Sequence, residues 1–338
     1  MKAMRMDRAG GDPRGSGGRS VLVAGAALAA LALAAAAGPA EATERTLLYA
    51  SPSPIGEPTW SPDGQWIAFW MERENEARDL FVIPSSGGEP QELTDLNGLI
   101  GSPAWSPDGG WIAFDYLGLG TDGQAIWKVK ADGSTVVQVV DTEGCDLEPA
   151  WSPDGSTIAF VDVETFQLRL VSGDGGAWWP LLGQYALQNP SWSPEGQWIG
   201  FAAHPPGWPG AAGCLYRIRA SGGDAEQLNC PRGLLSSIFE PVWSPDGAYF
   251  AFRSTSYPPF GVDAVYVWWI EGAIDNVTQL SDLTHRVADP AWSPDGRSIV
   301  YRNRTPWELW IARDFPFPGG PTHTEPSTWG RVRGRFRR

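Results

Sequence analysis

A five-residue motif, Trp-Ser-Pro-Asp-Gly, recurs six times along this chain of 338 residues. The motifs begin at Trp60, Trp105, Trp151, Trp192, Trp243 and Trp292, and Glu195 replaces the aspartate in the fourth. Consecutive motif tryptophans are separated by 45, 46, 41, 51 and 49 residues. Repetition with a period of about 40–50 residues is typical of propellers and related arrays. The repeat therefore predicts one closed domain built from six similar units.

Each unit is expected to contain four short strands. The first strand ends at the motif tryptophan, and Pro, Asp and Gly form the turn that follows it. A near-continuous apolar run comes next, as at residues 66–70, which is typical of a strand buried on both faces. Third and fourth strands follow, for example at residues 80–83 and 92–94. These patterns predict an all-β fold, a six-bladed β-propeller of four-stranded antiparallel blades spanning residues 43–314.

The sixth unit lacks a fourth strand of its own. After Ile311 the chain enters a proline-rich stretch, and proline cannot donate the hydrogen bond that a strand ladder needs. Near the other end, residues 45–50 read as a strand but belong to no unit. We therefore expect residues 46–49 to pair with residues 309–311, so that the N-terminal strand closes the last blade and removes the exposed sheet edges.

The first 42 residues have the organisation of a secretory signal peptide. Five basic residues precede an apolar run at residues 21–37, and Ala40 and Ala42 supply a small-residue cleavage site. An uncleaved membrane anchor is the alternative, but the run is short for a span of about 20 residues. We expect residues 1–42 to be removed, no transmembrane segment in the mature chain, and an extracytoplasmic location, either periplasmic or secreted.

The charge is distributed unevenly along the chain. The formal net charge is −14; residues 1–42 contribute +2 and residues 315–338 contribute +4, which leaves −20 for residues 43–314. So acidic a domain disfavours nucleic acid and anionic lipid as partners. We expect a monomeric domain whose partner is a protein or peptide with basic groups, or a cation. The Pro/Gly/Arg-rich residues 315–338 are expected to form a disordered tail, with an arm that grips an anionic surface as the alternative.

Around the motif the sequence resembles the TolB-type, WD-repeat-like β-propeller family. The family's blade motif, Pro-x-Trp-Ser-Pro-Asp-Gly followed by two variable residues and Ile-Ala-Phe, is matched throughout by residues 58–69. The other five units match it with few changes, starting at Pro103, Pro149, Pro190, Pro241 and Pro290. The resemblance covers about residues 46–311. It implies a stand-alone propeller that lacks the α/β domain of TolB and the hydrolase domain of propeller peptidases, and it leaves the function open.

Two of the three cysteines are placed to form a disulfide. Cys214 and Cys230 lie symmetrically about Gly222, within a predicted hairpin turn between two strands. Residues directly opposed on neighbouring strands are close enough to bridge, and an oxidising compartment permits the bond. Two buried free thiols are the alternative. Cys145 is expected to stay unpaired.

Motifs for catalysis are scarce after residue 42. The segment contains neither a Gly-x-Ser-x-Gly elbow nor a His-Glu-x-x-His zinc pattern, and its histidines, His204, His285 and His323, are far apart. The motif tryptophans fit an inter-blade core better than a ligand cage, and the motif aspartates are explained by turns rather than by a metal. We therefore expect a non-catalytic domain without a cofactor.

One set of polar residues is expected to meet in the channel. The residues three positions before the motif tryptophans are Glu57, Ser102, Glu148, Asn189, Glu240 and Asp289. If the first strand of each blade lines the channel, these six lie together at its mouth, and four of them are acidic. They either cap solvated loops or form an acidic mouth that binds a basic group. Loops on the same face carry Trp208, Tyr257 and Phe260, which offer aromatic contacts to a partner.

The function favoured by these patterns is an exported scaffold that binds a protein or peptide partner through the acidic channel face in the cell envelope. Two alternatives from other classes stay open. One is a lactonase-like hydrolase that acts in the channel with Ca²⁺ held by the same carboxylates. The other is a glycan-binding module that uses Trp208 and its neighbours.

Overall fold

The structure, a computed structural model, describes residues 44–118, 120, 123–142, 144–183, 185–204, 213–230, 235–256, 263–271, 277–281 and 286–313. All of them lie in one compact unit of the chain, Thr43–Arg338, and the other unit, Met1–Ala42, falls outside the described residues. The signal segment and the tail at residues 315–338 therefore stay predictions. Within the described part of the chain no helix is long and apolar enough to cross a membrane.

The described strands form six antiparallel sheets of four strands each. Blade 1 consists of β2 (Ile55–Trp60), β3 (Trp66–Glu72), β4 (Arg78–Pro84) and β5 (Gln91–Glu92). Blade 2 consists of β6 (Leu99–Trp105), β7 (Trp111–Leu117), β8 (Ala125–Lys130) and β9 (Val136–Val140). Blade 3 consists of β10 (Asp146–Trp151), β11 (Thr157–Asp162), β12 (Gln167–Ser172) and β13 (Trp178–Leu182).

The second half of the domain repeats this plan. Blade 4 consists of β14 (Ala186–Trp192), β15 (Trp198–His204), β16 (Cys214–Arg219) and β17 (Glu226–Asn229). Blade 5 consists of β18 (Leu235–Trp243), β19 (Tyr249–Ser256), β20 (Asp263–Trp269) and β21 (Val277–Gln279). Blade 6 consists of β22 (Val287–Trp292), β23 (Ser298–Arg304), β24 (Trp307–Arg313) and β1 (Glu44–Ala50).

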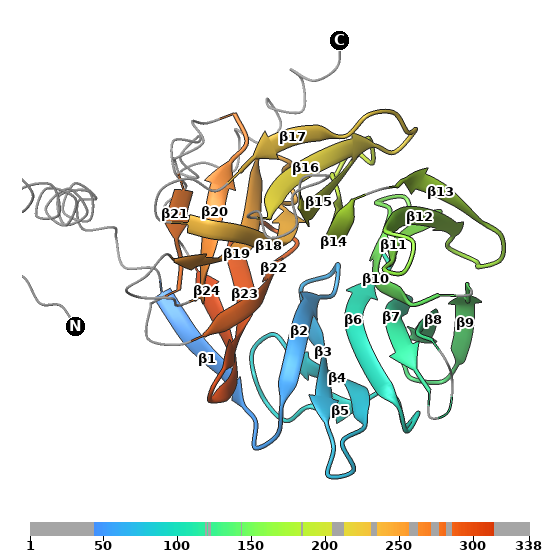
Figure 1. The fold of residues 1–338 in the computed structure, drawn as a ribbon. Coiled ribbons are helices and arrows are strands. Elements are labelled where there is room, and N and C mark those ends of the chain that lie inside the picture. The colour runs from blue at the N-terminus through green and yellow to red at the C-terminus, as the bar shows by residue number, and fades with distance from the viewer. Residues whose placement is uncertain are drawn as a thin grey trace, which may run out of the picture. The chain divides into compact units, whose positions relative to one another are not determined.

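The six blades stand around a common centre, with the first strand of each blade innermost (Figure 1). These strands contact one another in a closed order, from β2 through β6, β10, β14, β18 and β22 and back to β2. The predicted all-β, six-bladed propeller with four-stranded antiparallel blades is therefore confirmed.

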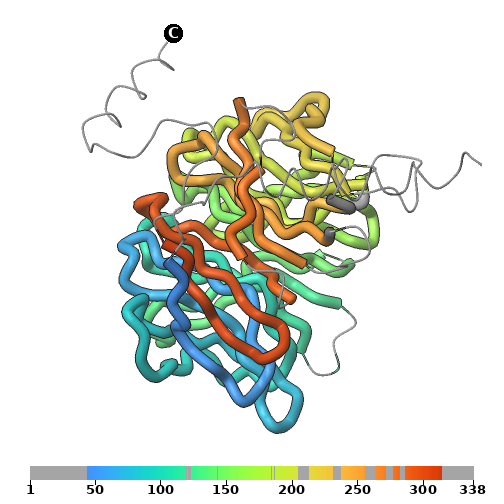
Figure 2. The backbone as a smooth tube through the Cα atoms, turned by 90° about the vertical axis from the view of Figure 1, so that its left-hand side faces the viewer, coloured from blue at the N-terminus to red at the C-terminus, as the bar shows by residue number. Residues whose placement is uncertain are grey.

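The last blade is closed by the N-terminal strand, as the sequence predicted. β1 pairs antiparallel with β24, and Thr46 lies opposite Ile311 while Leu47 lies opposite Trp310. A bulge follows Leu47, and pairing resumes between Tyr49 and Leu309. Figure 2 shows the blue N-terminal strand running beside the red C-terminal strands. β1 thus supplies the fourth strand of the last blade.

The repeated motif forms the turn between the first and second strands of each blade. In blade 1 the Ser61 hydroxyl donates to Asp63 Oδ1 (2.5 Å) and accepts the Trp66 N–H (2.9 Å). Gly64 closes the turn at a φ of +71°, a backbone conformation that favours glycine. The bond from hydroxyl to carboxylate recurs at Ser106, Ser152, Ser244 and Ser293. The motif aspartates thus act as turn residues, which agrees with their predicted role.

The second and third strands of each blade supply the core. Phe69 and Ile67 on β3 are fully buried, and they pack against Val300 and Leu309 of blade 6. Similar clusters fill the other inter-blade spaces; Trp243 and Trp292 are buried within them, and the other motif tryptophans pack against their margins. Each large apolar side chain that is fully buried contributes about 1.5–3 kcal/mol. The contacts between blades, rather than single sheets, therefore hold the ring together.

A disulfide joins Cys214, at the start of β16, to Cys230, directly after β17. Their Cα atoms are 4.4 Å apart, which fits residues opposed on neighbouring strands. Cys145 is free and half-buried. The bond links the third and fourth strands of blade 4 at one end of the sheet.

We predict that Tyr49→Ala destabilises the ring far more than Leu47→Ala, although both residues lie on β1. The half-buried Tyr49 ring packs against Phe69 of blade 1, with ring centroids 6.2 Å apart, whereas Leu47 is 44% exposed. Loss of the Tyr49 ring should lower the free energy of unfolding by about 2–3 kcal/mol, and loss of Leu47 by about 0.5 kcal/mol. Urea denaturation followed by circular dichroism measures both, and equal losses would contradict a stabilising contact between Tyr49 and Phe69 of blade 1.

Candidate functional site in the channel

The six residues predicted to meet in the channel share an unusual backbone. Their φ angles lie between +49° and +56°, and they form the channel ring: Glu57, Ser102, Glu148, Asn189, Glu240 and Asp289. Each follows a residue where the pairing of the first strand with the second shifts register, so each sits in a β-bulge. Residues other than glycine in this left-handed region are strained and cluster at functional sites. The strained backbone therefore indicates a functional site at the ring, independently of the charge of the ring residues.

Carboxylates hold the backbone N–H groups of the ring. Glu57 N–H donates to Asp289 (3.1 Å), Asp289 N–H to Glu240 (2.7 Å), and Asn189 N–H to Glu148 (2.5 Å). Ser102 N–H donates to Glu57 in the same way. These bonds run from one blade to the next, so the ring carboxylates contribute to the joints between blades.

At Ser102 the ring has no carboxylate to accept the N–H of the next blade. Asp115 on β7 accepts that N–H instead. The Glu148 N–H donates to Asp115 Oδ2 (3.2 Å), and Gln124 donates to Asp115 Oδ1 (3.0 Å). Asp115 is 3% exposed. A further buried carboxylate therefore joins the site between Glu57 and Glu148.

Two ring carboxylates are neutralised by arginines. Arg253 Nε lies 3.0 Å from Glu240 Oε1, and Arg302 forms an ion pair with Asp289. Arg302 also donates to the carbonyl of Ile55 (2.9 Å), which anchors it between blades 6 and 1. We call Glu240 and Asp289 the paired arc of the ring.

On blades 1 to 3, no arginine or lysine in the described part of the chain lies within ion-pair distance of the site carboxylates. Among the described residues, Glu57, Asp115 and Glu148 form no ion pair, and we call these three the unpaired arc. Glu57 accepts a hydrogen bond from Trp70 Nε1 (3.0 Å). The carboxyl groups of the channel that form no ion pair are therefore concentrated on blades 1 to 3.

Burial shifts the acid–base behaviour of these groups. It raises the pKa of Glu148 to about 8, reinforced by repulsion from Asp115, Glu57 and Glu240. Burial, with repulsion from Asp289, raises the pKa of Glu57 and of Glu240 to about 7. Burial also raises the pKa of Asp115. At neutral pH the ring therefore holds protons that ordinary carboxyl groups would have lost.

The ring surrounds a cavity of about 350 Å³ in the middle of the propeller. The prolines that follow the ring residues and four motif tryptophans, Trp60, Trp105, Trp151 and Trp192, complete its wall. The lining residues include neither histidine nor cysteine. The lining therefore offers carboxylates, one amide and the hydroxyl residues Thr59, Ser102 and Ser191 for binding, but neither an imidazole nor a thiol.

The structure brings five of the predicted site residues together. Glu57, Glu148, Asn189, Glu240 and Asp289 all line the cavity. The other three, Trp208, Tyr257 and Phe260, lie outside the described residues and stay predictions.

Three residues of the site escaped the sequence reasoning: Asp115, Arg253 and Arg302. Each directly follows the aromatic residue that ends the Ile-Ala-Phe run of the second strand, at Phe114, Phe252 and Tyr301. The signal that could have identified these residues was a charged residue directly after an apolar run that is expected to be buried. Charged side chains are rarely buried without partners.

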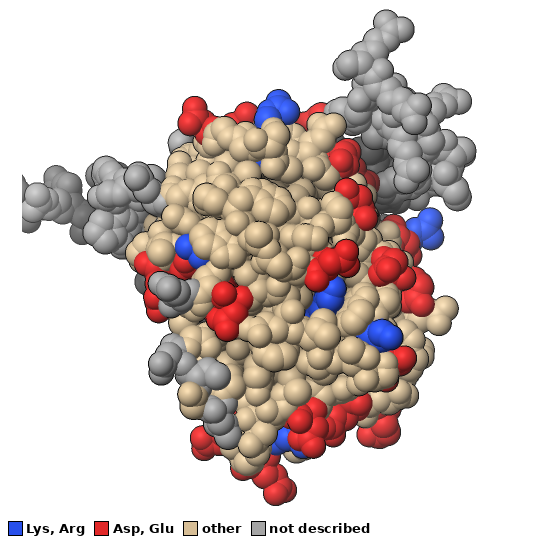
Figure 3. Space-filling view, turned by 90° about the vertical axis from the view of Figure 1, so that its right-hand side faces the viewer, with Lys and Arg blue, Asp and Glu red and all other residues tan. Residues whose placement is uncertain are grey.

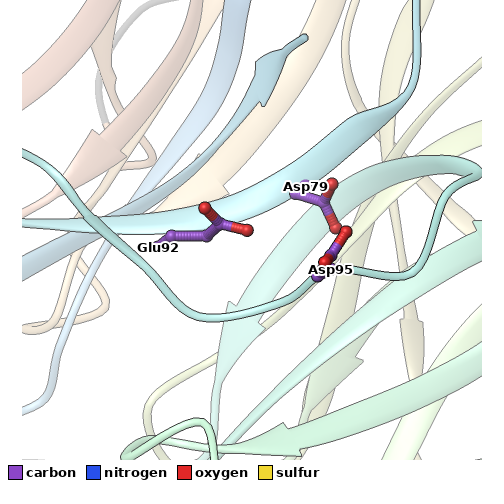
Figure 4. Close-up of side chains that lie close together, drawn as sticks. All are labelled: Asp79, Glu92 and Asp95. Atoms are coloured by element: carbon purple, nitrogen blue, oxygen red, sulfur yellow. The ribbon is translucent and has the colours of Figure 1, made fainter. Parts of the chain in front are cut away.

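A second acidic cluster lies on the outer part of blade 1. Figure 4 shows Asp79, Glu92 and Asp95 close together. Within the described ranges, they are the one trio of potential metal-ligating side chains with ligand atoms within 4.8 Å of one another. Arg73 forms ion pairs with all three, at 2.6 Å from Asp79 and 3.6 Å from Asp95. Because a guanidinium already neutralises the cluster, we assign it a structural role.

A family model described as the TolB beta propeller domain matches residues 40–181. The chain thus resembles the TolB-type propellers over that stretch. Its fold is similar to that of a TolB-type protein of Agrobacterium tumefaciens, with a TM-score of 0.62 and 23% identity over 80% of this chain and 94% of that chain. TolB of Acinetobacter baumannii gives a TM-score of 0.58 and 17% identity, over 88% of this chain and 71% of that chain. The resemblance inferred from the blade motif is confirmed.

Other similarities of this TolB-type propeller extend to different activities. A gluconolactonase of Xanthomonas campestris shares the fold with a TM-score of 0.60 and 15% identity, over 84% of this chain and 93% of that chain. A segment of 40 residues is 45% identical to YuxL of Bacillus subtilis (strain 168), named as an uncharacterized peptidase. That segment is 12% of this chain and 6% of the Bacillus protein. The structural similarities, at 15–23% identity, show the fold alone, and the Bacillus match covers too little of either chain to assign an activity, so function rests on the site.

We predict that the TolB-type propeller loses stability as the pH rises from about 5 to 8.5. The pKa of Glu148 is about 8 in the folded state against an ordinary value of 4.5, so the folded state binds the proton more tightly. Folding stability therefore falls through this window. Glu148→Gln keeps an acceptor for the Asn189 N–H and cannot ionise, so it should reduce the loss by roughly 1–3 kcal/mol.

Thermal or urea unfolding at a series of pH values measures this effect. Glu89→Gln, at an exposed position between β4 and β5, is the matched control and should follow the wild-type curve. The motif aspartates act in a different window, since hydrogen bonds lower the pKa of Asp154 to about 2 and their contribution is lost only in acid. If the stability of the wild type and of Glu148→Gln changed with pH in the same way, the raised pKa of Glu148 would not be the cause of the loss.

Proposed function

We propose that this TolB-type propeller is an extracytoplasmic binding protein that receives a basic group of a protein or peptide partner in its channel. The observation that carries the proposal is the asymmetry of the ring. Arg253 and Arg302 form ion pairs with the paired arc, whereas Glu57 and Glu148 of the unpaired arc line the same cavity and form no ion pair among the described residues.

A basic side chain is the ligand that suits the unpaired arc. Guanidinium and ammonium groups form strong hydrogen bonds with carboxylates, and arginine does so in a fixed, two-pronged geometry. The raised pKa values of Glu57 and Glu148 mean that an incoming cation favours the ionised carboxylates and releases protons. Binding energy is therefore available at carboxyl groups that accept hydrogen bonds within the domain but form no ion pair among its described residues.

Two further features support a macromolecular partner outside the cytoplasm. The formal charge of −20 over residues 43–314 attracts basic partners over a distance and repels nucleic acid. The signal-like segment at residues 1–42 favours export of the chain. The predicted loop residues Trp208, Tyr257 and Phe260 would extend the contact beyond the channel if they face the same side.

A cation-dependent hydrolase is the alternative that the fold leaves open. The similarity to a gluconolactonase and the carboxylates of the ring favour it. Against it, the described ring carboxylates form no trio of ligand atoms within mutual reach of one ion, whereas a calcium ion requires six to eight oxygen ligands. We therefore place the binding function first.

We predict that the pentapeptide acetyl-Gly-Gly-Arg-Gly-Gly-amide binds more tightly than the same peptide with citrulline, a neutral isostere of arginine. Its affinity should rise about tenfold from pH 6 to pH 8.5, because binding is linked to ionisation of the unpaired arc. Isothermal titration calorimetry in two buffers of different ionisation enthalpy measures both affinity and proton release.

The variant that tests the arc is Glu57→Gln with Glu148→Gln, and Glu89→Gln is its matched control. The double variant should weaken binding of the arginine peptide by about tenfold or more, while the control binds as the wild type does. Equal binding of the arginine and citrulline peptides would overturn the proposal.

We further predict that 5 mM Ca²⁺ does not raise the melting temperature relative to excess chelator. A specific ion bound only by the folded state would stabilise the domain by about 2.7 kcal/mol at one hundred times its dissociation constant. Differential scanning fluorimetry measures the shift. A rise of several degrees that disappears in Glu57→Gln would instead favour the hydrolase.

A further inference from the structure

A second groove lies on the outer rim of the propeller, between blades 2 and 3. It has a volume of about 530 Å³ and is lined by β9, by Asp141, and by the turn that leads into β13 with Trp178. The channel ring belongs to the innermost strands, so the two sites are separate. Figure 3 shows the side of the molecule that carries β9 and β13, where broad areas of surface have no charged side chain.

Trp178 is exposed yet firmly positioned. Its ring is 39% exposed, and the guanidinium of Arg169 lies 4.0 Å from the ring centroid. Arg169 is itself buried, with Asp162 at 2.5 Å and hydrogen bonds to Gln167 (3.0 Å) and Thr165 (3.1 Å). The arginine closes one face of the ring, and the exposed remainder of the ring borders the groove. Such a fixed ring costs little conformational entropy when a ligand stacks on it.

The rest of the groove is polar. Gln138 and Asp141 are exposed, and Gln138 Nε2 donates to Asp141 Oδ2 (2.9 Å). Between them Val139 and Val140 are buried, so they contribute mainly backbone to the groove. Gly176 N–H donates to the Val139 carbonyl (3.2 Å), which fixes the turn against β9. The groove thus combines one aromatic platform with hydrogen-bonding groups on the other side.

A substituent at Gly175 would not fit this turn. A Cβ atom there would lie 2.8 Å from the Val139 carbonyl oxygen, and the residue has a φ of +92°. The glycine therefore allows the turn to approach β9 closely and places Trp178 at the edge of the groove.

We propose that this groove binds a neutral saccharide, with one pyranose ring stacked on Trp178 and its hydroxyls bonded to Gln138 and Asp141. The C–H face of a pyranose is complementary to the electron-rich face of an aromatic ring. Its equatorial hydroxyls both donate and accept, which matches an amide beside a carboxylate. A site with an apolar platform and a few convergent polar groups is typical of small-ligand binding.

Other ligands fit the groove less well. An anion would be repelled by Asp141, and a cation would compete with Arg169, which already occupies one face of the Trp178 ring. An added peptide strand would need a continuous ladder along β13, but Pro180 lies in the middle of that strand and offers no N–H. The saccharide is therefore the occupant that the groove favours.

The neighbouring residue on the same strand offers a matched control. Trp179 is 45% exposed and lies opposite Leu170, whereas Trp178 lies opposite Val171. Because successive side chains of a strand point to opposite faces, Trp179 faces away from the groove. Loss of either ring removes a similar exposed area, so a difference between the two variants reports on the groove.

The test uses maltotriose, cellotriose, β-1,4-linked galactotriose and chitotriose, each up to 10 mM, in saturation-transfer NMR and calorimetry. At least one should bind to the wild type with a dissociation constant of about 1 mM or below, which corresponds to about −4 kcal/mol. Trp178→Ala should weaken that binding about tenfold or more, and Trp178→Phe by less. Gln138→Ala should weaken it about threefold or more.

Trp179→Ala and the channel variant Glu57→Gln with Glu148→Gln should bind the sugar as the wild type does. Near-ultraviolet circular dichroism checks that each variant is folded, and Trp178→Phe keeps the test decisive if Trp178→Ala unfolds. Binding of none of the four sugars, or binding unchanged in the folded Trp178 variants, would overturn the proposal. Because the channel variant is measured in parallel, failure here is distinguishable from failure of the channel proposal.

Discussion

The propeller depends on hydrogen bonds that cross from one blade to the next at its hub. Five of the six channel-ring residues donate their N–H to a carboxylate supplied by the preceding blade, namely Glu57, Ser102, Glu148, Asn189 and Asp289. Each donor sits in a bulge with a positive φ, which turns its N–H toward the neighbouring blade. Apolar clusters fill the space between the blades, and the polar ring fixes how the blades meet.

This construction gives the hub carboxylates two roles that compete. As acceptors for backbone N–H groups they stabilise the joints, but their burial and mutual repulsion raise their pKa values and store unfavourable energy. Two arginines form ion pairs with the carboxylates of blades 5 and 6, whereas Glu57, Asp115 and Glu148 form no ion pair among the described residues. A cationic ligand would relieve that energy there, which is why the same atoms serve both stability and the proposed binding. Strain of this kind is often retained at functional sites.

The sequence predicted those parts of the protein that repeat. Six copies of one motif gave the blades and the turn chemistry, and the lack of a fourth strand after Ile311 gave the closing role of β1. It did not predict the asymmetry of the ring, because Asp115, Arg253 and Arg302 directly follow apolar runs that are typical of ordinary core strands. It also missed the rim groove, since Trp178 gains its fixed position from Arg169 on the neighbouring strand, a contact that periodicity does not encode. The local structure of each repeat could be predicted from the sequence, whereas contacts between side chains on different strands became apparent only in the structure.

The pairing of β1 with β24 sets the order in which the chain is able to mature. Leu47 meets Trp310 only after the polypeptide between them has been synthesised, so the first-made strand waits for the last-made hairpin. Such a distant contact slows folding, because the entropy of closing a very long loop is lost before β1 forms its stabilising hydrogen bonds with β24. During that delay β1 and the β24 edge present unpaired backbone groups that invite association with other chains. We therefore expect the newly made propeller to bind chaperones until β1 pairs with β24.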